Sequence, residues 1–172
     1  MNKPIFLVGF MGSGKTTWGK KIANALDMPF VDLDHEIVAN IGMTIPEYFE
    51  EHGEENFRKL ENEYLKKQGD RLAIISTGGG TPCYYDNMDW INDNGLSLYL
   101  YHTSKSIWSR LSQSDVNKRP VLKGLTGNEL FEFIDSKLNE RAQYYEKAHI
   151  KFEQIHTSIE EIIELIKNYN QQ

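Results

Sequence analysis

The stretch that decides the fold is "GFMGSGKTTWG", residues 9–19, which follows the apolar run "PIFLV" at residues 4–8. It matches the pattern G-x-x-x-x-G-K-[ST], in which a glycine-rich loop between a strand and a helix surrounds a phosphate with backbone amides. Its glycines permit positive φ angles and a close approach of the backbone to the phosphate. In this motif the lysine reaches the β and γ phosphates, and the next hydroxyl binds Mg²⁺. The residues expected to contact the nucleotide are Gly12, Ser13, Gly14, Lys15, Thr16 and Thr17.

Short β-rich runs alternate with longer helical patterns along the chain. This alternation predicts an α/β fold with right-handed crossovers and a mostly parallel sheet that helices cover on both faces. Ligands of such folds bind beyond the carboxyl ends of the strands. The expected strands are residues 4–8, 29–33, 72–76, 96–101 and 150–154.

The helical patterns have recognisable starts. A hydroxyl residue followed three positions later by glutamate can satisfy two otherwise unpaired amides at a helix start. This capping box is expected for Thr44 with Glu47, Thr126 with Glu129, and Ser158 with Glu161. The expected helices are residues 15–26, 34–41, 45–51, 54–68, 85–92, 105–111, 127–147 and 159–168.

Length and composition limit the classes of protein. A chain of 172 residues with 40% hydrophobic content is enough for one core, so residues 1–172 are expected to form a single domain. A net charge of −6 argues against a broad nucleic-acid or anionic-membrane surface. The single cysteine, Cys83, forms no internal disulfide, which favours a reducing cytoplasm. No leader peptide or membrane span is expected, since apolar runs fall short of the roughly 18 residues that a span needs. We also expect a monomer.

The phosphate-binding loop predicts a nucleoside triphosphate but does not identify what receives the phosphate. Guanine-binding switches carry Asn-Lys-x-Asp, and "NKRP" at residues 117–120 lacks the aspartate. Mechanical ATPases are usually larger than this chain. A compact phosphotransferase that acts on a small molecule is therefore the favoured class.

Two aspartates follow the second expected strand, in "VDLDHE" at residues 31–36. On an extended chain, Asp32 and Asp34 point to the same side. One can stand near Mg²⁺ while the other accepts a proton or hydrogen bond from a substrate hydroxyl. Alternatively, Asp34 only caps the next helix. Ser76 stands where many phosphate-loop proteins have a metal-binding aspartate, so Asp32 is the expected magnesium partner beside Thr16.

The third expected strand ends in "STGGG", residues 76–80. Three consecutive glycines are costly in conformational entropy, and they allow a ligand to touch the backbone directly. A flexible turn is the alternative interpretation. Both interpretations remain open on the sequence.

Six motifs together resemble the shikimate kinase family, in order and across nearly the whole chain. The resemblance implies a three-layer α/β/α fold of nucleoside-monophosphate-kinase type, with a five-stranded parallel sheet in the order 2-3-1-4-5. It also implies MgATP-dependent phosphorylation of the 3-hydroxyl of shikimate, a step of chorismate and aromatic amino-acid biosynthesis. The motifs are "GFMGSGKTTWG", "DLD" at 32–34, "FRKLE" at 57–61, "STGGGTP" at 76–82, "KRPVL" at 118–122 and "NERAQYYEKAH" at 139–149.

The same resemblance assigns the acceptor site. Asp34 would bind the ring hydroxyls, including the one that reacts. Arg58 and Arg141 would bind the substrate carboxylate, since a guanidinium offers a planar fork for a carboxylate. Gly79 and Gly80 would contribute backbone contacts. Substrate-binding helices are then expected at about residues 34–62.

The resemblance also implies a mobile lid at about residues 112–124, a long polar interval with no assigned element. Arg119 would lie on this lid and touch both the transferred phosphate and the substrate. The family also has an adenine-stacking arginine shortly before the lid, which corresponds to Arg110, although the interval to Arg119 is longer here than is typical.

Two other functions fit parts of the pattern. A kinase resembling gluconate kinase would also need arginines for a carboxylated polyol, and a nucleotide-dependent regulatory protein would keep the loop but not catalysis. Intact Lys15, Thr16, Asp34 and Arg119 argue against the latter. Inert packing is expected for Cys83, and core or partly covered positions for Trp18, Trp90 and Trp108.

Overall fold

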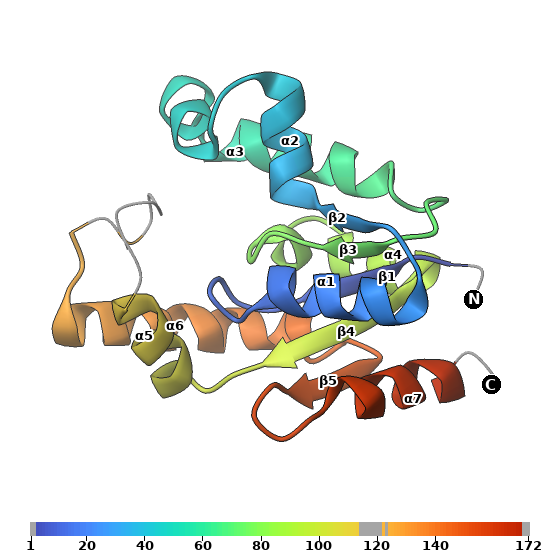
Figure 1. Cartoon of the computed structure of the whole chain (residues 1–172). Coiled ribbons are helices and arrows are strands. Elements are labelled where there is room, and N and C mark those ends of the chain that lie inside the picture. Colours follow the sequence, from blue (N-terminus) through green and yellow to red (C-terminus); the bar gives the residue numbers. More distant parts are fainter. Residues whose placement is uncertain (1–2, 114–121, 123, 170–172) are drawn as a thin grey trace.

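Five parallel strands form one sheet in the order β2-β3-β1-β4-β5 (Figure 1). The computed structural model describes residues 3–113, 122 and 124–169. The strand order is the one expected, and each strand lies within one residue or two of its expected bounds. The strands are β1 (Ile5–Val8), β2 (Phe30–Asp32), β3 (Ile74–Ser76), β4 (Leu96–Tyr101) and β5 (Ile150–Glu153).

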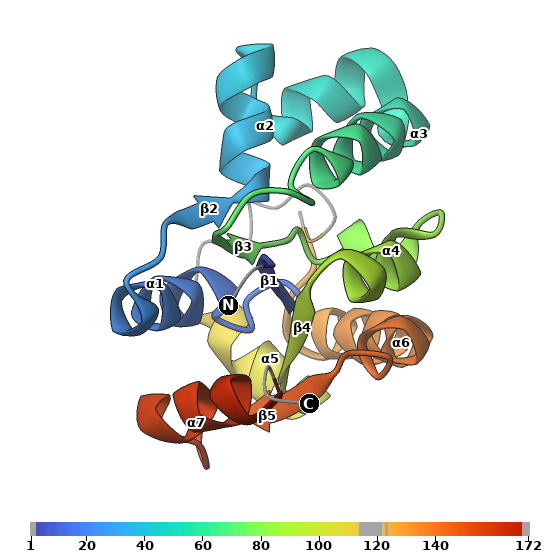
Figure 2. The ribbon, with the colours of Figure 1, turned by 90° about the vertical axis from the view of Figure 1, so that its right-hand side faces the viewer.

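Helices cover both faces of the sheet, which confirms the three-layer α/β/α architecture. Figure 2 shows α1 and α7 on one side and α4 and α6 on the other, with α2 and α3 at the β2 end. The helices are α1 (Lys15–Leu26), α2 (Leu33–Ile41), α3 (Ile45–Lys66), α4 (Asn87–Asn94), α5 (Ser104–Ser112), α6 (Gly127–Tyr145) and α7 (Ile159–Tyr169), with a short 3₁₀ turn at Thr81–Cys83.

The central strand β1 is apolar throughout because both of its faces are buried. Ile5 and Leu7 join a core cluster with α1 and α7. Phe6 and Val8 point to the opposite face and join the larger cluster beneath the other helices. Successive side chains of a strand alternate between its faces, so an uninterrupted apolar run is what a strand covered on both sides requires.

The helix α3 contains a break that the sequence indicates. Gly53 has φ 80° and ψ 162°, which are not helical angles, in the middle of the span. Separate helices at 45–51 and 54–68 were expected, and the non-helical glycine lies between them. A positive φ is easily adopted only by glycine, so this residue allows the chain to turn before Arg58.

Two of the expected capping boxes are present. The Thr44 amide donates to Glu47 Oε2 at 2.6 Å, and the Glu47 amide donates to Thr44 Oγ1 at 3.3 Å. Ser158 and Glu161 make the same reciprocal pair, at 2.7 and 3.2 Å. These bonds fix the starts of α3 and α7.

The prediction of a capping box at Thr126 is wrong. The helix α6 does begin there, but the Thr126 side chain makes no capping hydrogen bond. Gly127, the first residue of the helix, has φ 52°, in the left-handed region. This turn of the backbone changes the direction of the first helical amides relative to Thr126, so the pattern of residue types alone does not produce the box.

Within the described residues, no helix combines the length and the apolar character that crossing a bilayer would need.

Candidate active site

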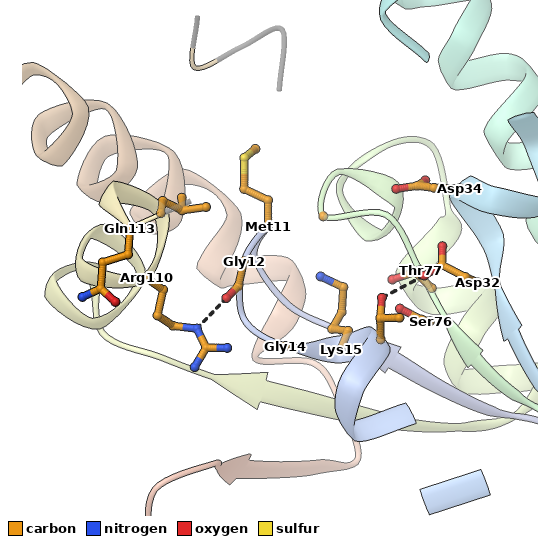
Figure 3. A pocket seen from close by; sticks show the side chains of 13 residues that line it. Met11, Gly12, Gly14, Lys15, Asp32, Asp34, Ser76, Thr77, Arg110 and Gln113 are labelled. Atoms are coloured by element: carbon orange, nitrogen blue, oxygen red, sulfur yellow. Dashed lines mark hydrogen bonds between the residues drawn. The ribbon is translucent and has the colours of Figure 1, made fainter. Parts of the chain in front are cut away.

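Two adjoining cavities lie at the carboxyl ends of the strands. The first, of about 670 Å³, extends from the phosphate-binding loop to the ends of β2 and β3 (Figure 3). The second, of about 360 Å³, lies between this edge of the sheet and the helices α2, α3 and α6. Met11, Asp34 and Gly79 line both cavities. A group bound in the first cavity would therefore meet a group bound in the second at these three residues.

The loop after β1 has the backbone conformation that the glycine pattern predicts. Gly9, Gly12 and Gly14 have φ angles of 144°, 75° and 98°. Gly12 also lacks space for a side chain, since a Cβ there would lie 2.8 Å from Leu111 Cδ2. Gly14 begins α1 with no side-chain cap, so the first amides of this helix are directed to the loop and its cavity.

Lys15 is the cation of the first cavity. Its Nζ donates to the carbonyl oxygens of Gly9 and Phe10 at 2.8 and 2.9 Å. The residue is only 8% exposed, and Figure 3 shows its ammonium group in the cavity between the loop and the aspartates. A buried ammonium in contact with backbone carbonyls is well placed to attract phosphate oxygens.

Thr16 and Asp32 meet at the end of β2. The Thr16 hydroxyl donates to Asp32 Oδ2 at 2.8 Å, and Asp32 Oδ1 accepts from the His35 amide at 3.3 Å. Mg²⁺ is commonly held by one or two protein oxygens, together with waters and phosphates. Thr16 and Asp32 fit that requirement, since an oxygen pair stands next to the loop that would hold the phosphates. No group of three or more His, Cys, Asp or Glu suited to a metal occurs within the described residues.

Asp32 and Asp34 do not lie on one extended chain, contrary to the sequence prediction. The strand β2 ends at Asp32 and α2 begins at Leu33, so Asp34 lies in the first helical turn and not on an extended chain. Asp32, rather than Asp34, caps this helix. Both carboxylates nevertheless line the first cavity, because the first turn of α2 directs Asp34 over the end of the sheet.

Asp34 is a partly buried carboxyl with an altered acidity. Burial raises its pKa to about 6, and the carboxylates of Glu61 and Asp32 act in the same direction. Lys15 and Arg58 lower the pKa but do not offset the rise. A carboxyl group with a pKa near 6 is ionised at neutral pH and can accept a proton more readily than an ordinary aspartate.

Arg58 is held in the second cavity by two glutamates and an aromatic ring. Its Nη1 donates to Glu61 Oε2 at 2.9 Å, and its Nε and Nη2 donate to Glu54 Oε1 at 3.2 and 3.0 Å. Its guanidinium carbon lies 4.3 Å from the centre of the Tyr84 ring. Glu61 is 1% exposed and also accepts from the Thr81 hydroxyl at 2.6 Å. These contacts fix the plane of the guanidinium group.

The supporting roles of Glu54, Glu61 and Tyr84 were missed by the sequence reasoning. For the glutamates a signal existed: Glu54 and Glu61 stand four residues before and three residues after Arg58, the spacings at which helical side chains meet. Tyr84 had no such signal because it comes from another segment.

The glycine run after β3 is closely packed, against backbone at Gly79 and against side chains at Gly78 and Gly80. A Cβ at Gly79 would lie 2.9 Å from the Met11 amide nitrogen, and a Cβ at Gly80 would lie 2.8 Å from Arg58 Nη1. Gly78 is equally crowded, with Asp34 Oδ1 at 2.8 Å from its hypothetical Cβ. None of the three has a positive φ. Close packing of the two cavity walls, rather than turn flexibility, therefore explains the run.

Arg141 reaches the second cavity from α6. Its Nη1 atom is buried and has no hydrogen-bond partner within the described part of the chain. Its guanidinium carbon lies 5.5 Å from the centre of the Phe10 ring. The residue lines the second cavity with its positive charge, so this position favours an anionic ligand.

Arg110 extends from α5 across the phosphate-binding loop. Its Nε donates to the Gly12 carbonyl at 2.8 Å, and its Nη1 donates to Gln154 Oε1 at 3.2 Å. It lines the first cavity beside Gln113 (Figure 3). Gln154 follows β5, and the sequence offered no signal for this contact between distant segments.

The expected lid is largely outside the described residues. Arg119 lies there, and only the ends of the interval 112–124 and Leu122 are described. The role of Arg119 stays a prediction from the resemblance.

Cys83 and the tryptophans are where packing would place them. Burial raises the pKa of the Cys83 thiol to about 11, so the thiol stays protonated at neutral pH. Trp18 is 4% exposed in the core cluster of α1 and α7. Trp90 and Trp108 are partly buried against the larger cluster.

Comparison with known proteins agrees with this geometry. The model of the shikimate kinase family matches residues 11–170. A shikimate kinase of Bacteroides fragilis is 40% identical over 171 residues, covering 94% of this chain and 95% of the relative. Another, of Flavobacterium psychrophilum, is 40% identical over 153 residues and covers 87% of each chain.

Solved structures give the same result. The crystal structure of a shikimate kinase from Bacteroides thetaiotaomicron superposes with a TM-score of 0.89 and 38% identity, covering 96% of this chain and 98% of that one. The shikimate kinase from Acinetobacter baumannii in complex with shikimate superposes with a TM-score of 0.87 and 31% identity, over 99% and 96% of the two chains. A gluconokinase from Sinorhizobium meliloti shares only the fold, with a TM-score of 0.52 and 14% identity. The chain therefore belongs to the shikimate kinase family.

Proposed function

We propose that this protein transfers the γ-phosphoryl group of ATP to the 3-hydroxyl of shikimate and releases shikimate 3-phosphate and ADP. One observation carries the proposal: Arg58 and Arg141 line the same small cavity as Asp34. This arrangement suits a small molecule with a carboxylate and hydroxyl groups, held next to the phosphate-binding loop. Membership of the shikimate kinase family supports the same substrate.

In the proposed reaction, Asp34 accepts the proton of the attacking hydroxyl while the oxygen of that hydroxyl bonds to the γ-phosphorus. The bond between that phosphorus and the bridging oxygen breaks, and ADP leaves. Lys15 stabilises the charge that spreads over the phosphoryl oxygens. Arg119 would add a second positive charge from the lid. These roles rest on the cavity geometry for Lys15 and Asp34, and on the resemblance for Arg119.

Thr16 and Asp32 would hold Mg²⁺ directly or through water. When bound, the ion neutralises phosphate charge and orients the β and γ phosphates. Gly12, Ser13, Gly14 and Thr17 would surround the phosphates, although the Ser13 amide already donates to the Phe10 carbonyl at 3.2 Å. Arg110 would cover the adenine from its position over the loop.

On the acceptor side, Arg58 and Arg141 would bind the shikimate carboxylate. Gly79 and Gly80 would contact the ring through their backbone atoms, since both line the second cavity. We further propose that the protein acts as a monomer in the cytoplasm, without nucleic acid or membrane. The single cysteine and the net charge of −6 support this setting.

A coupled assay of ADP release tests the proposed function. We expect turnover only when ATP, Mg²⁺ and shikimate are all present. Gluconate in place of shikimate serves as the control acceptor, because a gluconate-kinase-like enzyme would also use arginines for its carboxylate. Equal turnover without an acceptor, or turnover with gluconate alone, would reject the assignment.

Replacing Arg141 or Arg58 should have different effects on shikimate binding and on stability. Arg141→Ala is expected to weaken shikimate binding by about 1.5 to 3 kcal/mol, the range for a hydrogen bond to a charged group. Arg58→Ala should weaken shikimate binding similarly but also destabilise the fold, because buried Glu61 loses its positively charged partner and keeps only the Thr81 hydroxyl. Calorimetric titration with shikimate and thermal unfolding measure the two effects.

A matched control for the arginines is Arg71→Ala, which removes an exposed arginine paired with Glu36 at 3.2 Å. We expect it to leave shikimate binding unchanged. ATP binding should be spared in all three variants. Unchanged shikimate affinity in Arg141→Ala would place the carboxylate elsewhere.

The pKa of Asp34 predicts a pH dependence. The group must be ionised to accept a proton, so kcat/KM for shikimate should fall as the pH drops below about 6, with a slope of one proton. Steady-state kinetics at saturating MgATP between pH 5 and 8 measure this limb. If Asp34→Asn, assayed at high enzyme concentration, keeps the same acid limb, another group is responsible.

A further inference from the structure

His102 follows β4 and is buried behind the phosphate-binding loop, with 6% of its surface exposed. Its Nε2 lies 2.8 Å from the Ser13 carbonyl oxygen, and its Nδ1 lies 3.0 Å from the Ser106 hydroxyl. Ser106 stands in the first turn of α5, the helix that carries Arg110. The imidazole thus connects the loop to the start of this helix.

The partners of the ring determine where its hydrogen lies. A carbonyl oxygen can only accept, so Nε2 carries the hydrogen and donates it to Ser13. Nδ1 then accepts from the Ser106 hydroxyl. Burial lowers the pKa of His102 below its ordinary value, and the nearby cations Arg110 and Lys15 lower it further, which keeps the ring neutral at pH 7.

The bond to Ser13 has a consequence on the other side of the peptide. In a trans peptide the C=O and the next N–H point in opposite directions, so the Gly14 N–H is directed away from His102. Gly14 lines the first cavity and starts α1. The preceding peptide is held in a similar way, because the Gly12 carbonyl accepts from Arg110 Nε at 2.8 Å. Both contacts come from the segment that runs from the end of β4 through α5.

We propose that His102 is a positioning residue for the nucleotide: by holding the Ser13 carbonyl, it directs the Gly14 amide at the phosphate in the first cavity. This inference rests on the proposed function only as far as nucleotide binding. His102 touches no reacting atom, and its effect should appear in the affinity for nucleotide and not in the affinity for shikimate.

The test compares ADP and shikimate affinities, measured by calorimetry, in His102→Leu and His102→Gln. Leucine removes the donor, and we expect the Kd for ADP to rise about three- to tenfold, the effect of one ordinary hydrogen bond. Glutamine retains a side-chain N–H near the position of Nε2 and should restore most of the affinity. The Kd for shikimate should not change in either variant. The amide chemical shift of Gly14 should move in the leucine variant and return with glutamine.

The matched control is His149→Leu, directly before β5. His149 also binds a serine, since its Nδ1 accepts from the Ser97 amide at 3.2 Å, but it lies away from both cavities. This variant should lose stability without changing the Kd for ADP. If His102→Leu weakened the binding of ADP and of shikimate equally, or left the Kd for ADP unchanged, the proposal would be overturned. Failure of glutamine to restore any affinity would also overturn it.

A second variant covers the case in which His102→Leu does not fold. Ser106→Ala removes the hydroxyl that holds Nδ1 and with it the orientation of the imidazole ring, and we expect about a twofold rise in the Kd for ADP. An unchanged Kd in this variant would then reject the role of His102. ADP binding by the wild-type chain needs no acceptor, so a failure of shikimate turnover would leave this test intact.

Discussion

Lys15→Met should lower kcat by roughly 10² to 10³, the effect of removing one preorganised electrostatic contact to the transition state. Methionine keeps the length of the side-chain stem but has no charge and no donor. Lys15 Nζ lies 2.8 and 2.9 Å from two loop carbonyls, at the surface of the first cavity. The lost charge therefore affects phosphoryl transfer, while core packing is preserved. Steady-state kinetics with shikimate and MgATP measure the effect.

The control for this variant is Lys20→Met, an exposed lysine on the same helix. It makes the same change in net charge away from the cavity, and we expect kcat to stay within about twofold of the wild type, since a charge separated by solvent is largely screened. Thermal unfolding should show both variants folded. A wild-type kcat in Lys15→Met would remove Lys15 from the mechanism.

Asp34→Asn is expected to lower kcat by roughly 10² or more, in line with the contribution of a general base. Asparagine keeps the shape of the side chain and can still accept a hydrogen bond, but it cannot take a proton from the hydroxyl. Because Asp34 lines both cavities, its loss should affect the chemical step more than the affinity for either substrate. A change confined to the KM for ATP would show that Asp34 serves only the nucleotide.

Asp34→Asn should increase stability although it lowers kcat. Folding raises the pKa of Asp34 from 3.8 to about 6, so the folded chain binds this proton more tightly than the unfolded chain. The free energy of unfolding must then decrease as the pH rises from about 4 to about 6, and the cost persists at neutral pH. Asparagine carries no charge, so Asp34→Asn should unfold at a higher temperature than the wild type at pH 7.

Glu36→Gln is the matched control for both effects. Glu36 lies on the same helix but pairs with Arg71 at 3.2 Å, outside both cavities. We expect kcat to be unchanged and thermal stability to be equal or slightly lower. A gain of stability combined with a loss of activity would distinguish Asp34 as a residue kept for chemistry.

Local patterns were enough to predict most of the fold. Apolar runs without polar interruption identified strands that are covered on both faces, and the glycine pattern at residues 9–14 identified the phosphate-binding loop with its positive φ angles. These properties depend on a few consecutive residues, which is why they can be read from one sequence. The box at Thr126 failed because the backbone angle of Gly127 is not encoded by the residue types that define the pattern.

The acceptor site depended on contacts that no local pattern contains. Arg58 lies on α3 and Arg141 on α6, and a single arginine on a charged helix usually faces solvent. The family resemblance placed them in one site, but only the tertiary structure gives the physical reasons: buried Glu61 and the Tyr84 ring fix Arg58, and Nη1 of Arg141 is buried without a partner among the described residues.

The sequence by itself thus determined the succession of strands and helices along the chain and the phosphate-binding loop, because these follow from short-range spacing. The acceptor-site candidates came from the family resemblance. The tertiary structure decided which of those residues meet. Asp34 lies in a helical turn where the two cavities meet. The glycines after β3 are closely packed and do not form a flexible turn. His102 binds Ser13, which is 89 positions away in the chain. Such contacts arise only when the sheet and its covering helices pack, since packing brings together segments that are distant in the sequence.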